Sequence, residues 1–175
     1  MRDMSVTVYS FDELSDDAKE RALNAFRGVN VEFNWYEDTF DTIRTAGKLI
    51  GLGIDRIYFD TDSYCTFDAQ YQYVRGAVKA VRASLQGVVR KLQALQKRHF
   101  YSLSCAVTKG RSMNYYRCFR FGEDYECDLG DIIDDFAHWA RILLRDEYEY
   151  LTSDEAVKEM IEANEYEFDE AGNLS

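Results

Sequence analysis

The sequence predicts an α+β protein in which an antiparallel sheet of hairpins packs against four to five helices. Three observations lead to this fold class. The chain has 175 residues, of which 46% are hydrophobic and 15% aromatic, so it can bury one core of ordinary size. Hydrophobic side chains recur about every 3.6 residues in some segments and every second residue in others. Turn-forming residues separate the strand-like runs, which favours antiparallel hairpins. We expect residues 1–175 to form a single α+β domain.

The first third of the chain predicts a short strand and two helices. Residues 5–11 are rich in β-branched and aromatic side chains, which favour a strand. Ser15 is a preferred N-cap, two acidic residues follow it in the positive first turn, and Gly28 is a typical helix end. A second helix is expected at about residues 34–50, where hydrophobic residues keep the helical spacing before two glycines.

Two hairpins are predicted in the middle of the chain. Residues 54–60 and 65–73 alternate apolar and polar side chains, and the intervening TDS is turn-forming. Residues 101–108 and 114–121 form a second pair around KGRS. Alternation of this kind is typical of half-buried strands, so we expect these four runs to share the antiparallel sheet.

The remaining segments predict further helices and a short terminal strand. Residues 76–98 keep the helical spacing, but Gly87 costs about 1 kcal/mol relative to alanine, so one helix and two helices are both open. Residues 131–150 carry the strongest apolar stripe. Ser153 is expected to cap a last helix, and the ending YEFDEAGNLS predicts an edge strand and a glycine turn.

The formal net charge of −11 is unevenly distributed along the chain. Residues 1–41 carry −6, residues 42–120 carry +10 and residues 121–175 carry −15. The densest block, residues 146–170, has eleven acidic side chains opposed only by Lys158. Such a block can serve solubility alone. Because tyrosines and a phenylalanine alternate with its carboxylates, it can also attract and hold a basic protein surface.

If charge complementarity drives recognition, the acids and tyrosines of this block form the contact surface. The predicted partner-binding residues are Glu147, Tyr148, Glu149, Tyr150, Asp154, Glu155, Glu159, Glu162, Glu165, Tyr166 and Glu167, with Asp16, Asp17 and Glu20 as an extension. The basic middle segment, residues 42–120, is the alternative surface. Its lysines and arginines can grip phosphate, but we favour a solvated face paired against the acidic ends, because the net charge repels nucleic acid.

Metal and catalytic sites were sought among the histidines and cysteines. The four cysteines have no CxxC spacing and no nearby histidine pair, which favours buried, reduced thiols; they are Cys65, Cys105, Cys118 and Cys127. His138 lies beside Asp134 and Asp135 on one helical face, where an ion pair or a packed histidine is favoured over a weak metal site. We therefore expect no catalytic residue, no metal and no cofactor.

Two ligand loops are also rejected. The segment DTDSY begins like a calcium loop, but Cys65 and Tyr71 stand where that loop requires glycine and glutamate. The glycines form neither of the known nucleotide-binding patterns. Adjacent carboxylates such as Asp134 and Asp135 are expected by chance in a chain with 32 acidic residues.

Three blocks carry a family resemblance: YSFDELSDDAKERAL, WYEDTFDTIRTAGKLIGLGIDRIYF and EYEYLTSDEAVKEMIEANEYEF. They resemble a family of small bacteriophage and prophage proteins often labelled "antitoxin of toxin–antitoxin stability system". The resemblance covers nearly the whole chain and implies a phage or mobile-element origin and a setting in the host cytoplasm. It implies no functional residues. The usual antitoxin layout, a basic DNA-binding N-terminus joined to a disordered tail, is not seen in this sequence.

The sequence therefore predicts a non-enzymatic, acidic inhibitor that binds a basic surface of a host defence protein or nucleoprotein complex. This is an anti-CRISPR or anti-restriction type of role, with competition against nucleic acid for that surface. The alternatives are an antitoxin-like neutraliser of a basic toxin, and a small metal-dependent or carboxylate-dependent enzyme. No direct nucleic-acid binding is expected.

A cytoplasmic location in a bacterial host is expected. The start, MRDMSVTVYS, lacks the basic-then-apolar order of a signal peptide. No stretch approaches the roughly 18 consecutive apolar residues that a membrane span needs, so we expect no membrane partner. The sequence leads to no prediction of the oligomeric state.

Overall fold

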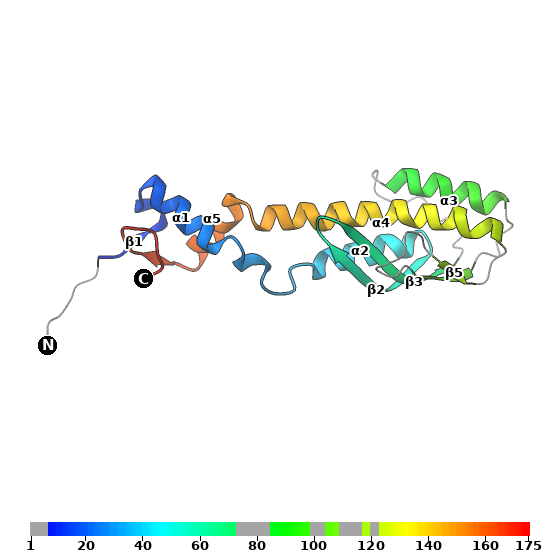
Figure 1. Cartoon of the computed structure of the whole chain (residues 1–175), viewed down its shortest axis with the longest axis horizontal. Helices are drawn as coiled ribbons and strands as arrows, with labels where there is room; N and C mark the ends of the chain where they lie inside the picture. The colour runs from blue at the N-terminus through cyan, green and yellow to red at the C-terminus, as the bar shows by residue number, and fades with distance from the viewer. Residues whose placement is uncertain (1–6, 73–84, 99–103, 109–116, 120–122) are drawn as a thin grey trace. The chain divides into compact units, whose positions relative to one another are not determined.

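The chain adopts the predicted α+β fold (Figure 1). The computed structural model describes residues 7–72, 85–98, 104–108, 117–119 and 123–175. Its helices are α1 (Asp16–Phe26), α2 (Glu37–Leu49), α3 (Gln86–Arg98), α4 (Glu123–Leu151), α5 (Asp154–Ala163) and the short 3₁₀ turns η1 (Phe11–Glu13) and η2 (Val29–Val31). Its strands are β1 (Tyr9–Ser10), β2 (Leu52–Asp60), β3 (Tyr64–Gln72), β4 (Ser104–Thr108), β5 (Arg117–Phe119) and β6 (Glu167–Phe168).

Two compact units divide the chain. Residues 1–35 and 147–175 form one, here called the terminal unit, and residues 36–146 form the other, the central unit. The boundary between residues 146 and 147 falls inside α4. The expectation of a single domain stays a prediction.

The central unit contains the predicted sheet. Its strand order is β2-β3-β4-β5, and every neighbouring pair is antiparallel. Both predicted hairpins are confirmed in their described parts. Residue 73, the KGRS turn at residues 109–112, and residues 101–103, 114–116 and 120–121 lie outside the described residues. Asp60 closes the β2–β3 turn, because its carboxylate accepts hydrogen bonds from the Asp62 and Ser63 amides at 3.1 and 3.0 Å and from the Ser63 hydroxyl at 2.7 Å.

Helices pack on one face of this sheet. Phe67 of β3 contacts Phe136 of α4, with ring centroids 5.6 Å apart. Gly47 lets α2 approach β2 closely, because a Cβ there would lie 2.8 Å from the Leu52 carbonyl oxygen. A side-chain ion pair between Lys91 and Asp135 joins α3 to α4. Of the predicted helix at residues 76–98, residues 76–84 lie outside the described residues, and the rest is one helix.

The terminal unit has its own small core. In the two-stranded pair of β1 and β6, Tyr9 is opposite Phe168 and Ser10 is opposite Glu167. The predicted edge strand at the C-terminal end is thereby confirmed. The buried side chains come from η1, α1, α5, β6 and the turn after η1: Phe11, Leu14, Ala18, Ala22, Val157, Ile161 and Phe168.

The predicted strand at residues 5–11 is wrong over most of its described part. Only Tyr9 and Ser10 are in a strand, and η1 follows at Phe11. The reason is a capping box, in which the Glu13 carboxylate accepts hydrogen bonds from the Ser10 amide and hydroxyl, both at 2.9 Å. Residues 5 and 6 lie outside the described part.

Both predicted serine N-caps are confirmed, whereas α1 ends at Phe26, two residues before the predicted Gly28. The Ser15 hydroxyl accepts a hydrogen bond from the Ala18 amide, and the Ser153 hydroxyl accepts one from the Ala156 amide, both at 3.3 Å. The predicted helix at residues 131–150 is confirmed and is longer in the structure, where α4 runs from Glu123 to Leu151. Among the described residues, no helix is long and apolar enough to cross a membrane.

Candidate protein-binding face

All eleven residues predicted to contact a partner lie in the terminal unit. α5 orients three of them outward: its apolar side, with Val157 and Ile161, is buried in the core, whereas Glu155, Glu159 and Glu162 are exposed. Of the others, Glu147 and Tyr166 are half-buried and the remainder are exposed: Tyr148, Glu149, Tyr150, Asp154, Glu165 and Glu167. The proposed extension on α1, Asp16, Asp17 and Glu20, is exposed as well.

The junction between α4 and α5 is fixed by hydrogen bonds from the segment after α1. Arg27 donates to the Thr152 carbonyl oxygen at 2.8 Å and to the Asp154 carboxylate at 2.7 Å. Asn30 donates to the Leu151 carbonyl oxygen at 3.0 Å. Asp154 is therefore already paired within the chain, and it is a weaker candidate for partner contact than the prediction assumed.

Two of the three predicted tyrosine anchors also pack within the terminal unit. Tyr148 contacts Trp35 with ring centroids 5.6 Å apart, and Tyr166 contacts Phe26 at 5.2 Å. Tyr150 is 52% exposed and is the most accessible of the three. The packed rings hold their positions before any partner arrives, which lowers the entropy lost on binding.

Sequence reasoning missed Phe33, which is 83% exposed. It lies between η2 and α2, outside any periodic pattern. Its exposure could have been suspected from the sequence, because Phe33 is a large apolar residue in a segment for which no buried position was predicted. The exposed large hydrophobic residues among the described residues all belong to the terminal unit: Val8, Phe33, Tyr148, Tyr150 and Leu174.

The terminal unit also carries the net charge of the protein. It holds 17 acidic and 5 basic side chains, a net charge of −12. The central unit holds the remaining 15 acidic and 16 basic side chains, a net charge of +1. Acidic charge and exposed apolar side chains therefore coincide in one compact unit, the terminal one.

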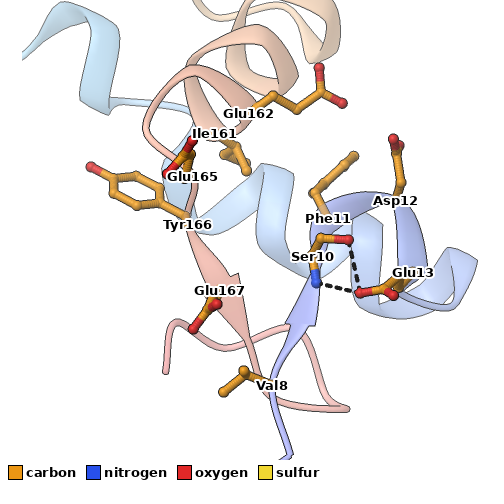
Figure 2. A pocket seen from close by; sticks show the side chains of 10 residues that line it. All are labelled: Val8, Ser10, Phe11, Asp12, Glu13, Ile161, Glu162, Glu165, Tyr166 and Glu167. Atoms are coloured by element: carbon orange, nitrogen blue, oxygen red, sulfur yellow. Dashed lines mark hydrogen bonds between the residues drawn. The ribbon is translucent and has the colours of Figure 1, made fainter.

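A cavity of about 430 Å³ opens on the terminal unit (Figure 2). Its walls carry five carboxylates, and its apolar lining comes chiefly from three side chains. The carboxylates are Asp12, Glu13, Glu162, Glu165 and Glu167, and the apolar side chains are Val8, Phe11 and Ile161. We call this cavity the acidic groove. Figure 2 shows the η1 carboxylates on one side of it and Glu165 and Glu167 on the other.

Hydrogen bonds already position part of the groove. The bonds from Ser10 hold the Glu13 carboxylate in place and lower its pKa, with the bond from the Ser10 amide as the largest cause. Lys158 pairs with Asp12 at 3.1 Å and with Glu162 at 3.3 Å. Its ammonium group also lies 5.8 Å from the centroid of the Phe11 ring.

The described part of the central unit has a cavity of about 520 Å³, but the acids that line it are Asp135 and Asp146, and Lys91 lines it as well. Cys65 is buried and forms no disulfide, as predicted, and burial raises the pKa of its thiol to about 12. His138 is exposed, and its neighbour Asp135 pairs with Lys91. No group of three or more His, Cys, Asp or Glu side chains that could hold a metal ion occurs among the described residues. The side chains of Cys105, Cys118 and Cys127 lie outside what the structure describes.

Comparison of the chain with protein-family models, with curated proteins and with solved structures found no match. The expected relation to small phage and prophage proteins therefore stays a prediction. The geometry and charge of the chain itself carry the functional inference.

Proposed function

We propose that this protein acts by binding, and that its terminal unit occupies a basic surface of a partner protein. One observation carries the proposal: the compact unit that holds a net charge of −12 also holds the exposed large hydrophobic residues of the described chain. Carboxylates steer a basic partner toward the surface and set the salt dependence of association. Exposed aromatic rings such as Phe33 and Tyr150 supply the contact energy that charge alone does not.

The partner class follows from the sign of the charge. A dense row of carboxylates repels phosphate and attracts surfaces rich in lysine and arginine. Nucleic-acid-binding proteins present such surfaces. The terminal unit would therefore compete with nucleic acid for the basic surface of the partner. The proposed role is inhibition of a host defence protein or nucleoprotein complex.

Affinity capture from a bacterial lysate tests this proposal. The bait is the full chain, washed at about 50 mM and about 500 mM salt, because screening weakens contacts between exposed charges. We expect a stoichiometric complex that is weakened but still detectable at high salt and that is displaced by added nucleic acid. Phe33→Ala combined with Tyr150→Ala should weaken it at both salt concentrations, since apolar contacts are not screened.

The control is a pair of exposed central-unit changes, Asp38→Asn with Asp55→Asn, which should leave capture intact. If the aromatic variant captures the same protein as strongly as the wild type at every salt concentration, the proposed face is wrong. A captured basic toxin in place of a defence protein would overturn the proposed role and keep the proposed face.

A further inference from the structure

The acidic groove is lined by groups of two kinds whose combination restricts the ligand. Its polar wall is made of five carboxylates with the side chains of Ser10 and Tyr166, and no lysine, arginine or histidine is among its lining residues. Its other lining is apolar, from Val8, Phe11 and Ile161. The C-terminal end of α5, the negative end of the helix dipole, adjoins it at Glu162. A ligand that fits must therefore be cationic at one end and apolar along its length.

The chain's own Lys158 shows how one edge of the groove binds such a group. Its ammonium pairs with Asp12 and Glu162, which both line the groove, and lies over the Phe11 ring. Glu13 is held by Ser10. Glu165 and Glu167 form no ion pair with any described residue, so their carboxylates face the groove without an internal cation.

We propose that the acidic groove binds a lysine or arginine side chain from an extended segment of the partner protein. This inference rests on the proposed function and names the chemistry of its contact. The cation would pair with Glu165 and Glu167, while the aliphatic stem would lie on Val8, the apolar lining residue that is exposed. Long basic side chains bury their stems on apolar surface in this way and keep the charge in a polar setting.

A basic side chain fits this groove better than a metal ion. The described acids include no cluster of three or more that could hold a metal. A hydrated ion would also gain nothing from the apolar lining. The chain's own ammonium, bound over an aromatic ring between two carboxylates, has the geometry expected for a side-chain cation.

Amide NMR titration of the full chain with short capped peptides tests the assignment. The probes are acetyl-Val-Arg-Val-amide, acetyl-Gly-Arg-Gly-amide, acetyl-Val-Gln-Val-amide and magnesium chloride. We expect Val-Arg-Val to cause saturable shifts confined to the groove, at Ser10, Glu13, Glu165, Tyr166 and Glu167. Gly-Arg-Gly should bind more weakly, because it offers no apolar neighbours, and Val-Gln-Val should not bind.

Three variants sharpen the test. Glu165→Gln combined with Glu167→Gln should weaken Val-Arg-Val binding about tenfold, the loss of a charge-assisted pair. The matched control on the preceding helix α5, Glu155→Gln with Glu159→Gln, removes the same charge outside the groove and should have little effect. Lys158→Gln should tighten binding, because it frees Asp12 and Glu162 for the ligand.

Several results would overturn the proposal. Equal shifts with magnesium chloride would show a site for hydrated cations. Shifts spread evenly over exposed acids such as Asp17 and Glu20, or equal losses in the test and control variants, would show only a diffuse electrostatic field.

If partner capture requires Phe33 and Tyr150 but survives the Glu165→Gln and Glu167→Gln changes, the groove inference fails and the proposed function stands. If the groove binds Val-Arg-Val while the aromatic changes leave capture intact, the proposed function fails alone.

Discussion

At the scale of single residues, Gly172 fixes the C-terminal turn of the terminal unit. Its φ is +86°, a backbone conformation that side chains with a Cβ rarely adopt. A Cβ at this position would lie 2.3 Å from the carbonyl oxygen of Ala18 on α1. The turn after β6 therefore packs directly against the α1 backbone.

Gly172→Ala should destabilise the protein by about 2 kcal/mol, from left-handed backbone strain and from the clash with α1. Gly28→Ala is the matched control, because a Cβ at Gly28 meets nothing within 4 Å. Urea denaturation followed by circular dichroism measures both. Equal midpoints for the two variants would show that the turn does not pack as described.

Asp169 organises the same turn and makes its stability depend on pH. Its carboxylate accepts hydrogen bonds from the Asn173 side chain and from the Asn173 and Ala171 amides, each at 2.9 Å. These bonds lower its pKa, with the Asn173 side chain as the largest cause. Because the folded pKa lies below the unfolded one, the contribution to stability is present above the unfolded pKa and is lost as pH falls through the folded value.

Asp169→Ala should therefore lower the free energy of unfolding at pH 7. The difference from the wild type should shrink as pH falls below the unfolded pKa of about 3.9, and it should disappear only at the lower pH where the carboxyl group is protonated in both states. Comparing two proteins at each pH removes the separate effect of relieved repulsion among the other acids. Denaturation curves at several pH values measure the difference. A difference that stays constant down to low pH would contradict the assigned hydrogen bonds.

At the scale of elements, α5 ends in an unusual way. Glu165 follows the helix with φ of +53°, the left-handed position that glycine normally occupies after a helix. The Tyr166 amide donates to the Ile161 carbonyl oxygen at 3.2 Å and completes the helix end. A glutamate here adds strain, and its carboxylate lines the acidic groove.

Glu165→Gly should therefore raise the free energy of unfolding by about 1 kcal/mol and weaken Val-Arg-Val binding at the same time. Glu159→Gly, at an exposed position inside α5, is the control and should destabilise by a similar amount, because glycine is unfavourable within a helix. Thermal denaturation and the NMR titration give the two readouts. A loss of stability in Glu165→Gly would argue against a strained helix end.

The predictable elements were those with local signals. Ser15 and Ser153 predicted the starts of their helices because serine is a preferred N-cap. Alternating apolar and polar residues around the TDS turn predicted the β2–β3 hairpin. The capping box at Ser10 and Glu13 was missed, although its spacing is local, because the β-branched run before it favoured a strand. The acidic groove had no local signal. Asp12 and Glu167 line the same groove only because β1 pairs with β6, and pairing between Ser10 and Glu167, 157 residues apart, leaves no periodic pattern in the sequence.

At the scale of the whole molecule, charge separates by unit. The sequence showed acidic ends and a basic middle, but it did not show that the ends form one compact unit. The exposed aromatic residues gather in that same unit. A face that served solubility alone would not require those apolar side chains, which favours the binding role.

The most direct test of the central claim compares two triple charge reversals in binding to the captured partner. Glu155→Lys, Glu159→Lys and Glu162→Lys change exposed positions of α5, whereas Asp38→Lys, Asp55→Lys and Asp131→Lys change exposed positions of the central unit. Each set adds six charges and moves the net charge from −11 to −5, and circular dichroism confirms the fold of both. Glu155 and Asp38 each stand second in their helices, so the helix-dipole cost is matched.

The measurement is the association rate constant as a function of ionic strength. We predict that the α5 set lowers the rate at low salt by about tenfold or more and flattens its salt dependence, while the central-unit set binds like the wild type. Equal losses of association rate in both sets would show that only net charge matters. Wild-type rates in both sets would show that the acidic face of the terminal unit takes no part in binding. Either result would contradict the account.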